Sequence, residues 1–200
     1  MKHRRKILIV LAGLLGFFLL LNLPYFWVQA KHLLFGSYKT TYQNQPAVEA
    51  SEKIYMEPNT LVIEDLGIEA PVVYVEEKSE KTYQAALQNG VVHYPGTAKP
   101  GEAGNVYIFG HSSDYLWSRG NYKTVFALLP RVEIGALVNL SNEEGEIFTY
   151  TITDKFVASP KDTQLLSQDT GGKKILTLQT SYPIGTALKR YIVIAELINQ

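Results

Sequence analysis

The sequence predicts a mainly β fold, either a closed barrel or a sandwich with a few short helices, preceded by one N-terminal transmembrane helix. Three observations predict it: a long apolar run near the N-terminus, many short β-type runs beyond residue 60, and Gly or Pro between those runs. The 200 residues fit one domain plus an appendage, because domains commonly hold about 100–200 residues. A composition of 46% hydrophobic and 12% aromatic residues excludes disorder over most of the chain.

The first element is the apolar run Ile7–Val28, which follows a basic tail in residues 1–6 and contains no charged side chain. Its 22 residues match the roughly 20 that a helix needs to cross a bilayer. Because basic flanks stay in the cytoplasm, we expect a single-pass protein of the cell membrane with an extracellular C-terminal domain. The competing interpretation is a cleaved signal peptide, since Val28-Gln29-Ala30 loosely resembles a cleavage site.

The polar segment 29–59 is expected to tether this helix to a β-rich domain, residues 60–200, and Glu49–Met56 within it has a helical pattern. Along Ile147–Ala158, aromatic and aliphatic residues alternate with threonines, which is the two-residue period of a strand. Two later runs, Lys174–Thr180 and Arg190–Leu197, are apolar on both faces in their middles, as central strands are. The expected strands are Leu61–Glu64, Val72–Val75, Asn105–Gly110, Ala136–Leu140, Ile147–Ala158, Lys174–Thr180 and Arg190–Leu197, and the expected helices are Glu80–Gln88 and Tyr122–Leu128.

Composition removes several classes of function. The lack of cysteine excludes a disulfide scaffold, a thiolate zinc site, a lipoprotein anchor and a thiol nucleophile. Four scattered histidines leave little for a transition-metal site, and we interpret Glu143, Glu144 and Glu146 as a solvated turn rather than a calcium site. We therefore expect no cofactor and no metal. The first six residues carry four positive charges, so the other 194 hold 15 basic and 19 acidic residues, which argues against nucleic acid as a partner.

Three clusters carry side chains capable of chemistry. An apolar strand ends just before His111, which can carry a proton near neutral pH or can be an ordinary loop histidine. A second buried strand runs into Ser181, where a hydroxyl is well placed as a nucleophile, although serines that merely end a strand are common. Arg190 opens the last expected strand on the side of Ile192 and Ile194, and its guanidinium suits either a developing oxyanion or an edge charge.

The order of these clusters resembles the sortases, membrane-anchored cysteine transpeptidases of bacterial cell surfaces. The resemblance covers residues 60–197 and implies a closed eight-stranded β-barrel with a few short helices. It also implies cleavage of an LPxTG-like sorting signal of a surface protein, with transfer of the acyl group to an amine of the cell wall or of a pilin. The matching residues are Gly110-His111, Thr177-Leu178-Gln179-Thr180-Ser181 and Arg190, with Gly90, Tyr94-Pro95-Gly96-Thr97, Pro100-Gly101 and Gly104-Asn105 in their usual order.

Carried over position by position, the resemblance makes His111 the general acid and base of catalysis. It gives Arg190 the role of binding the oxyanion or the substrate backbone. It makes Thr180 and Asn105 substrate-binding. The main departure is Ser181, which stands where the family has its nucleophilic cysteine. A hydroxyl needs an adjacent general base, whereas a thiol is partly ionised near neutral pH.

Three interpretations of Ser181 remain open. It is an engineered replacement of cysteine, a native nucleophile, or the mark of a pseudoenzyme that binds sorting signals without cutting them. A serine peptidase of unrelated mechanism is a further alternative, although the sequence contains no Gly-x-Ser-x-Gly elbow. Asp114, three residues after His111, is the candidate orienter of the imidazole ring that a serine mechanism needs.

Overall fold

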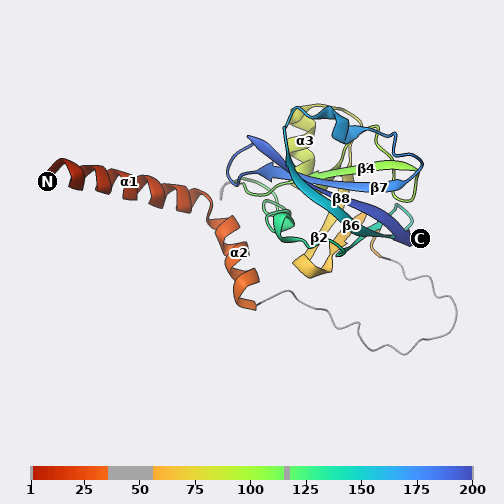
Figure 1. Ribbon diagram of the computed structural model, residues 1–200, viewed down its shortest axis with the longest axis horizontal. Coiled ribbons are helices and arrows are strands. Elements are labelled where there is room, and N and C mark those ends of the chain that lie inside the picture. Colours follow the sequence, from red (N-terminus) through yellow and green to blue (C-terminus); the bar gives the residue numbers. More distant parts are fainter. Residues whose placement is uncertain (1, 36–55, 115–117, 200) are drawn as a thin grey trace.

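Residues 2–35, 56–114 and 118–199 are described by the computed structural model shown in Figure 1. Eight strands close into one β-barrel, in which the neighbours follow the order β1-β2-β3-β4-β7-β8-β6-β5. The closed eight-stranded fold is therefore confirmed. The strands are β1 (Thr60–Ile63), β2 (Ile68–Tyr74), β3 (Val91–His93), β4 (Gly104–Gly110), β5 (Leu137–Ser141), β6 (Ile147–Ala158), β7 (Lys174–Tyr182) and β8 (Lys189–Asn199).

The described helices lie outside the barrel wall. Two of them precede the barrel and extend from one side of it (Figure 1). Of the expected linker 29–59, the first seven residues continue the second helix, and the expected helical stretch Glu49–Met56 lies outside the described residues except for Met56. The helices are α1 (Lys2–Leu21), α2 (Leu23–Phe35) and α3 (Glu80–Leu87), and the 3-10 helices are η1 (Glu64–Leu66), η2 (Leu129–Arg131) and η3 (Thr163–Leu166).

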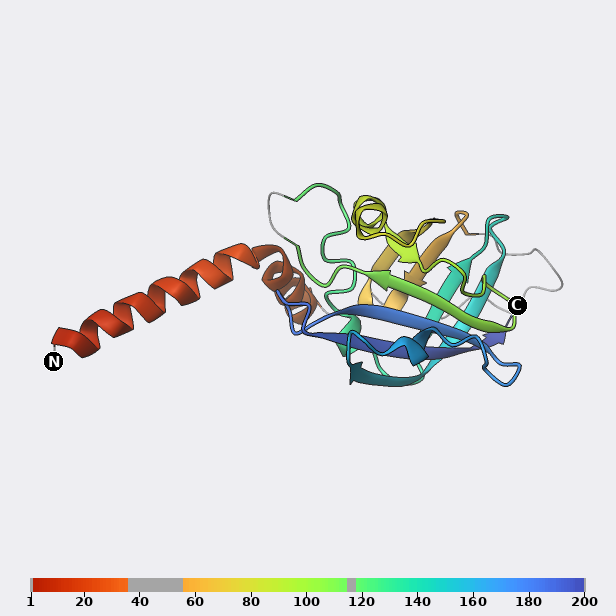
Figure 2. The same ribbon diagram turned by 90° about the horizontal axis from the view of Figure 1, so that it is seen from above.

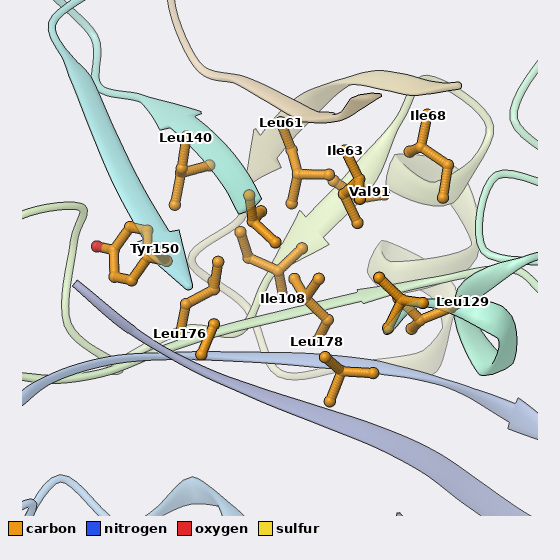
Figure 3. Packing of buried hydrophobic residues seen from close by; sticks show 14 of the residues in the cluster. Leu61, Ile63, Ile68, Val91, Ile108, Leu129, Leu140, Tyr150, Leu176 and Leu178 are labelled. Carbon is orange, nitrogen blue, oxygen red and sulfur yellow. The ribbon is translucent and has the colours of Figure 1, made fainter. Parts of the chain in front are cut away.

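Apolar side chains that alternate along the strands fill the barrel (Figure 3). In β6, Phe148, Tyr150 and Ile152 are buried while the threonines between them are partly or fully exposed, which confirms the predicted two-residue period. Leu176 and Leu178 of β7 are completely buried on the same interior side. Burying each such side chain contributes roughly 1.5–3 kcal/mol, so this interior is the main stabilising element of the fold.

The structure contains one strand that the sequence analysis did not predict, β3. It pairs parallel with β2 and antiparallel with β4, and so links two halves of the barrel. Three residues are too few to display a two-residue period, so only its bounding residues Gly90 and Pro95 signal it in the sequence.

The predicted helix Tyr122–Leu128 is wrong. The chain forms successive turns there, such as the one closed by Val125 N–H on the Tyr122 carbonyl at 3.3 Å, and it then enters η2. In a helix the N–H of Phe126 would bond the carbonyl of Tyr122. It donates instead to the carbonyl of His111 at 2.9 Å, so a tertiary contact replaces the helical one.

The predicted anchor Ile7–Val28 is not one straight helix, because α1 and α2 meet at Asn22 with a bend of 75°. Pro24 explains the break: it has no N–H to donate, and its ring clashes with the carbonyl four residues earlier. The Asn22 side chain donates to the carbonyl of Phe18 at 2.9 Å and so satisfies one end of α1. No single described helix is long and apolar enough to cross a membrane, but the bent pair meets both criteria when its two helices are taken together.

Candidate active site

Strand register brings three of the predicted residues together. β4 and β7 run parallel with Gly110 opposite Thr180, so His111, the first residue after β4, lies beside Ser181, the next residue of β7. β8 runs antiparallel to β7, with Arg190 opposite Ser181. In Figure 2 these strand ends lie at the end of the barrel that faces α2.

Ser181 and Arg190 also share the outer face of the barrel. In β7, Leu176, Leu178 and Thr180 are buried, and Leu176 and Leu178 pack in the interior, so Ser181, on the alternate side of the strand, points outward. Directly paired residues of antiparallel strands project from the same face. The hydroxyl and the guanidinium therefore face the same space, and both residues are only partly buried.

Three hydrogen bonds hold the ends of the strands in place. The Thr180 hydroxyl donates to the carbonyl of Gly110 at 2.8 Å and ties β7 to β4 beneath the site. The Phe126 N–H holds the backbone of His111, as described above. The N–H of Gly185, in the β7–β8 loop, donates to the Ser113 hydroxyl at 3.2 Å and joins that loop to the segment after His111. Both loops of the site are thus fixed to each other and to the barrel.

The ring of His111 lies beside a carboxylate. Its Nε2 is 4.0 Å from Oδ2 of Asp114, and the hydroxyl of Ser118 donates to Oδ1 of the same carboxylate at 2.7 Å. Burial lowers the pKa of His111, and the negative charges of Asp114 and Glu80 partly counteract that shift. The imidazole is therefore mainly neutral near pH 7, the form that can accept a proton.

The guanidinium of Arg190 is held at the N-terminal end of β8. Its Nη1 donates to the carbonyls of Ala187 at 3.0 Å and Lys189 at 3.1 Å. Burial raises the pKa of Tyr107, and the positive charge of Arg190 counteracts part of that effect, so the two side chains interact electrostatically. The Tyr107 hydroxyl in turn donates to Oε1 of Gln179 at 2.7 Å.

The other two predicted site residues lie apart from these side chains. Thr180 is buried, and its hydroxyl donates to the carbonyl of Gly110. Asn105 is buried at the opposite end of β4, where its amide donates to the carbonyl of Leu165 and its oxygen accepts from Thr177, each at 2.8 Å. These contacts fasten the β6–β7 connection to the barrel, and the structure does not bring Asn105 to the ends of β4 and β7.

Sequence reasoning missed an aromatic cluster on the outer face of β4. Phe109 precedes His111 by two residues and so projects from the same face. Its ring packs edge-on against Tyr83 of α3 at a centroid distance of 5.1 Å and against Tyr94 at 6.4 Å. The alternation of Asn105, Tyr107, Phe109 and His111 was the available signal, but it does not show that α3 covers this face.

A cavity of about 750 Å³ lies elsewhere, at the end of the barrel that carries the β5–β6 turn. His93, Glu102 and Glu143 are among its lining residues, and none of the three converging site residues lines it. In that turn, Oδ1 of Asn142 accepts hydrogen bonds from the backbone N–H groups of Glu144 and Glu146. Within the described part of the chain, no group of three His, Asp or Glu residues is placed to hold a metal ion.

Comparison with known proteins identifies the domain. The model of the sortase domain family matches residues 61–198. Sortase D of Bacillus subtilis is 30% identical over 160 residues, which cover 76% of this chain and 72% of that protein. The structure of the Sortase D5 transpeptidase of Clostridium perfringens is 30% identical, with a TM-score of 0.57 over 70% of this chain and 78% of that one.

Sortase C-1 of Actinomyces oris is similar in fold, with 24% identity and a TM-score of 0.59 over 70% of this chain and 73% of that chain. The match of the family model spans the whole barrel from β1 to β8, and it includes the converging ends of β4, β7 and β8. The chain belongs to the sortase family of transpeptidases.

Proposed function

We propose that this chain cleaves an LPxTG-like sorting signal of a surface protein and transfers the acyl group to an amine of the cell wall or of a pilin. One observation carries the proposal: strand register sets His111, Ser181 and Arg190 at neighbouring positions at one end of the barrel. The aromatic cluster beside β4 offers an apolar wall along which an extended peptide can lie.

In the proposed reaction, Oγ of Ser181 attacks the carbonyl carbon of the scissile peptide bond while His111 takes the hydroxyl proton. His111 then gives that proton to the leaving amine as the C–N bond breaks, which leaves an ester on Ser181. The acceptor amine attacks the ester, His111 takes a proton from it, and Ser181 recovers a proton as it departs. Arg190 stabilises the negative oxygen formed at each attack.

We assign Asp114 the role of a positioning residue for His111. A hydroxyl ionises far less readily than a thiol, so a serine mechanism depends on a well-oriented base. The carboxylate lies 4.0 Å from Nε2 of His111, close enough to stabilise the imidazolium that forms when the serine proton is taken.

A noncatalytic sorting-peptide binding module is the second candidate, and two observations favour it. The resemblance puts Ser181 at the position of the family's cysteine, and among the described residues no hydrogen bond joins the Ser181 hydroxyl to the His111 ring, whose nearest charged partner is Asp114. Such a pseudoenzyme would use the same outer face of β4 and β7 without turnover. A serine peptidase that releases the acyl group to water instead of to an amine is the third candidate.

The test compares four forms of the full chain in detergent micelles: the present sequence, Ser181→Ala, Ser181→Cys, and Ser181→Cys with His111→Ala. Each is incubated with labelled sorting peptides, with and without an acceptor amine. We expect slow transfer by the present sequence and a strong increase in Ser181→Cys, because a thiolate needs less activation. Removing His111 should cost about 10²–10⁴-fold of that rate, which is the usual effect of a general acid–base group.

The outcomes separate the candidates. Activity that disappears in Ser181→Ala makes Ser181 a working nucleophile, and release to water in the presence of amine identifies a peptidase. Saturable peptide binding without turnover, unchanged in Ser181→Ala, identifies a binding module. A folded Ser181→Cys chain that shows no turnover and no covalent adduct by mass spectrometry, over a broad peptide panel, contradicts the sortase-type mechanism.

We also propose that residues 7–28 anchor the protein in the cell membrane, with residues 1–6 in the cytoplasm and the domain 60–200 outside. The basic tail and the apolar helices α1 and α2 support this topology. A protease added to intact cells should digest the domain and leave the first residues protected. Recovery of a domain that begins at Lys31 from the medium would show a cleaved signal peptide instead.

A further inference from the structure

One side of α2 packs on the active-site end of the barrel. Nε2 of Gln29 donates to the carbonyl of Ala127 at 2.9 Å, and Val28 packs against the barrel core. At the bend, Asn22 is buried, and a Cβ added at Gly185 would lie 2.9 Å from its Oδ1. α2 and the residue that precedes it thus contact the segment after His111 and the β7–β8 loop.

The opposite side of α2 is apolar and uncovered. Leu23, Trp27 and Leu34 are 54%, 61% and 75% exposed. They follow one another at spacings of four and seven residues, which keeps them on one stripe of a helix. Nζ of Lys31 lies 5.4 Å from the centroid of the Trp27 ring, so a positive charge borders the stripe.

The bend determines where this stripe points relative to a bilayer. The apolar part of α1, residues 7–21, is short for a bilayer, and such a stretch is accommodated by local thinning of the bilayer and by flanking basic side chains such as Lys6 that reach the headgroups. With α1 placed in this way along the membrane normal, a helix bent by 75° from it lies nearly parallel to the membrane surface. A helix in that position with Trp and Leu on one side and Lys at its edge suits the boundary between acyl chains and anionic headgroups. The barrel on the other side of α2 then lies in the aqueous phase.

We propose that α2 is an interfacial helix whose stripe of Leu23, Trp27 and Leu34 lies in the outer surface of the phospholipid bilayer. Its other side holds the active-site end of the barrel against the membrane. This inference rests on the membrane anchor proposed above, and it adds an orientation to that anchor: the groove beside β4 and β7 receives sorting signals at the membrane surface. Lys31 contacts phosphate groups of the lipid.

The connection to the catalytic residues is short. Ala127, which accepts the hydrogen bond from Gln29, directly follows Phe126, whose N–H holds the backbone of His111. Gly185, which contacts Asn22, also donates to Ser113. Lipid contact on the stripe of α2 is therefore transmitted through two packed contacts to the loops that carry the site.

The test measures how deep a single tryptophan lies in the bilayer at each of two positions of α2, in lipid nanodiscs that contain the full chain. The chain has two tryptophans, so Trp117→Phe leaves Trp27 as the one tryptophan, which is excited selectively over the tyrosines. In a second variant, Trp27→Phe and Leu34→Trp are added, which moves the fluorophore seven residues along the same stripe. Nanodiscs of phosphatidylcholine and phosphatidylglycerol carry bromine either near the headgroup end or near the methyl end of the acyl chains, and bromine quenches nearby tryptophan.

We expect both variants to lose fluorescence to a similar extent and more strongly with bromine near the headgroup. A helix that continued along the membrane normal would separate the two positions in depth by about 10 Å, at 1.5 Å per residue. The control adds Glu143→Trp to Trp27→Phe and Trp117→Phe, and it places the fluorophore in the exposed β5–β6 turn at the far end of the barrel. It should not be quenched.

Quenching of one variant without the other, or stronger quenching of either by bromine near the methyl end, would overturn the interfacial helix. If the chain fails to co-purify with the nanodiscs at all, the membrane anchor itself fails, and this inference fails with it. The two failures are distinguishable by gel filtration, and neither measurement depends on turnover. Thermal unfolding of each variant confirms that the barrel is folded.

Discussion

Substituting Gly110→Ala should destabilise the barrel at the base of the candidate active site. A Cβ added at Gly110 would lie 2.8 Å from Cδ2 of Phe126 and 3.0 Å from Cγ1 of Val91. Both neighbours are completely buried, so neither can turn away into solvent. Overpacking of this kind costs roughly 1–3 kcal/mol, which corresponds to a loss of roughly 2–12 °C in melting temperature for a domain of this size.

The assay is thermal unfolding of the full chain in detergent micelles, followed by near-ultraviolet circular dichroism. Gly16→Ala is the matched control, because an added Cβ there meets nothing within 4 Å. That control should leave the melting temperature of the barrel unchanged.

A double-mutant cycle identifies the clash. Phe126→Leu alone should destabilise by leaving a cavity, but combined with Gly110→Ala it should cost less than the sum of the two single changes. Residues in contact typically couple by about 0.5–3 kcal/mol. An unchanged melting temperature in Gly110→Ala, or strictly additive effects in the double variant, would refute the close-packing argument.

Three further predictions concern charge and hydrogen bonding. Because Asp114 counteracts the lowering of the His111 pKa by burial, Asp114→Asn should lower that pKa further; an NMR titration of the ring that shows a rise or no shift contradicts this. Burial also lowers the pKa of His93, so the unfolded chain binds its proton at higher pH and stability should fall as the pH drops below about 6.5. Melting curves at neutral and acidic pH should show a smaller fall for His93→Gln. Oε1 of Gln168 accepts the N–H groups of Ala98 and Asn105, so Gln168→Leu should cost roughly 1–3 kcal/mol for each N–H left unpaired, and an unaltered melting temperature would rule that out.

Most strands of the barrel could be predicted because their signal is local. β6 spans twelve residues, and the alternation of apolar residues with threonines over 148–153 is long enough to separate a two-residue period from a helical one. β3 could not be predicted in this way, because its three residues acquire strand geometry from the pairing with β2 and β4. The helix predicted around Phe126 is wrong for a related reason. The spacing of its apolar residues suits a helix, but the N–H of Phe126 donates to the carbonyl of His111.

The proposed membrane anchor, residues 7–28, was likewise only partly predictable from the sequence. Its length and lack of charge are visible in the sequence, and Pro24 signals a possible break. The direction of the bend, and the burial of Asn22 against the β7–β8 loop, depend on how α2 packs on the barrel. No periodicity in residues 7–28 carries that information.

The order of motifs in the sequence determined the family and named His111, Ser181 and Arg190 as candidates, because short segments keep their residue types wherever they fold. Only the tertiary structure decided which candidates meet. Gly110 and Thr180 are seventy positions apart in the chain, yet they are opposite each other in the sheet, and that register depends on closure of the whole barrel. The same closure buries Asn105 at the other end of β4, since a side chain's place along a strand, and not its residue type, determines which end of the barrel it reaches.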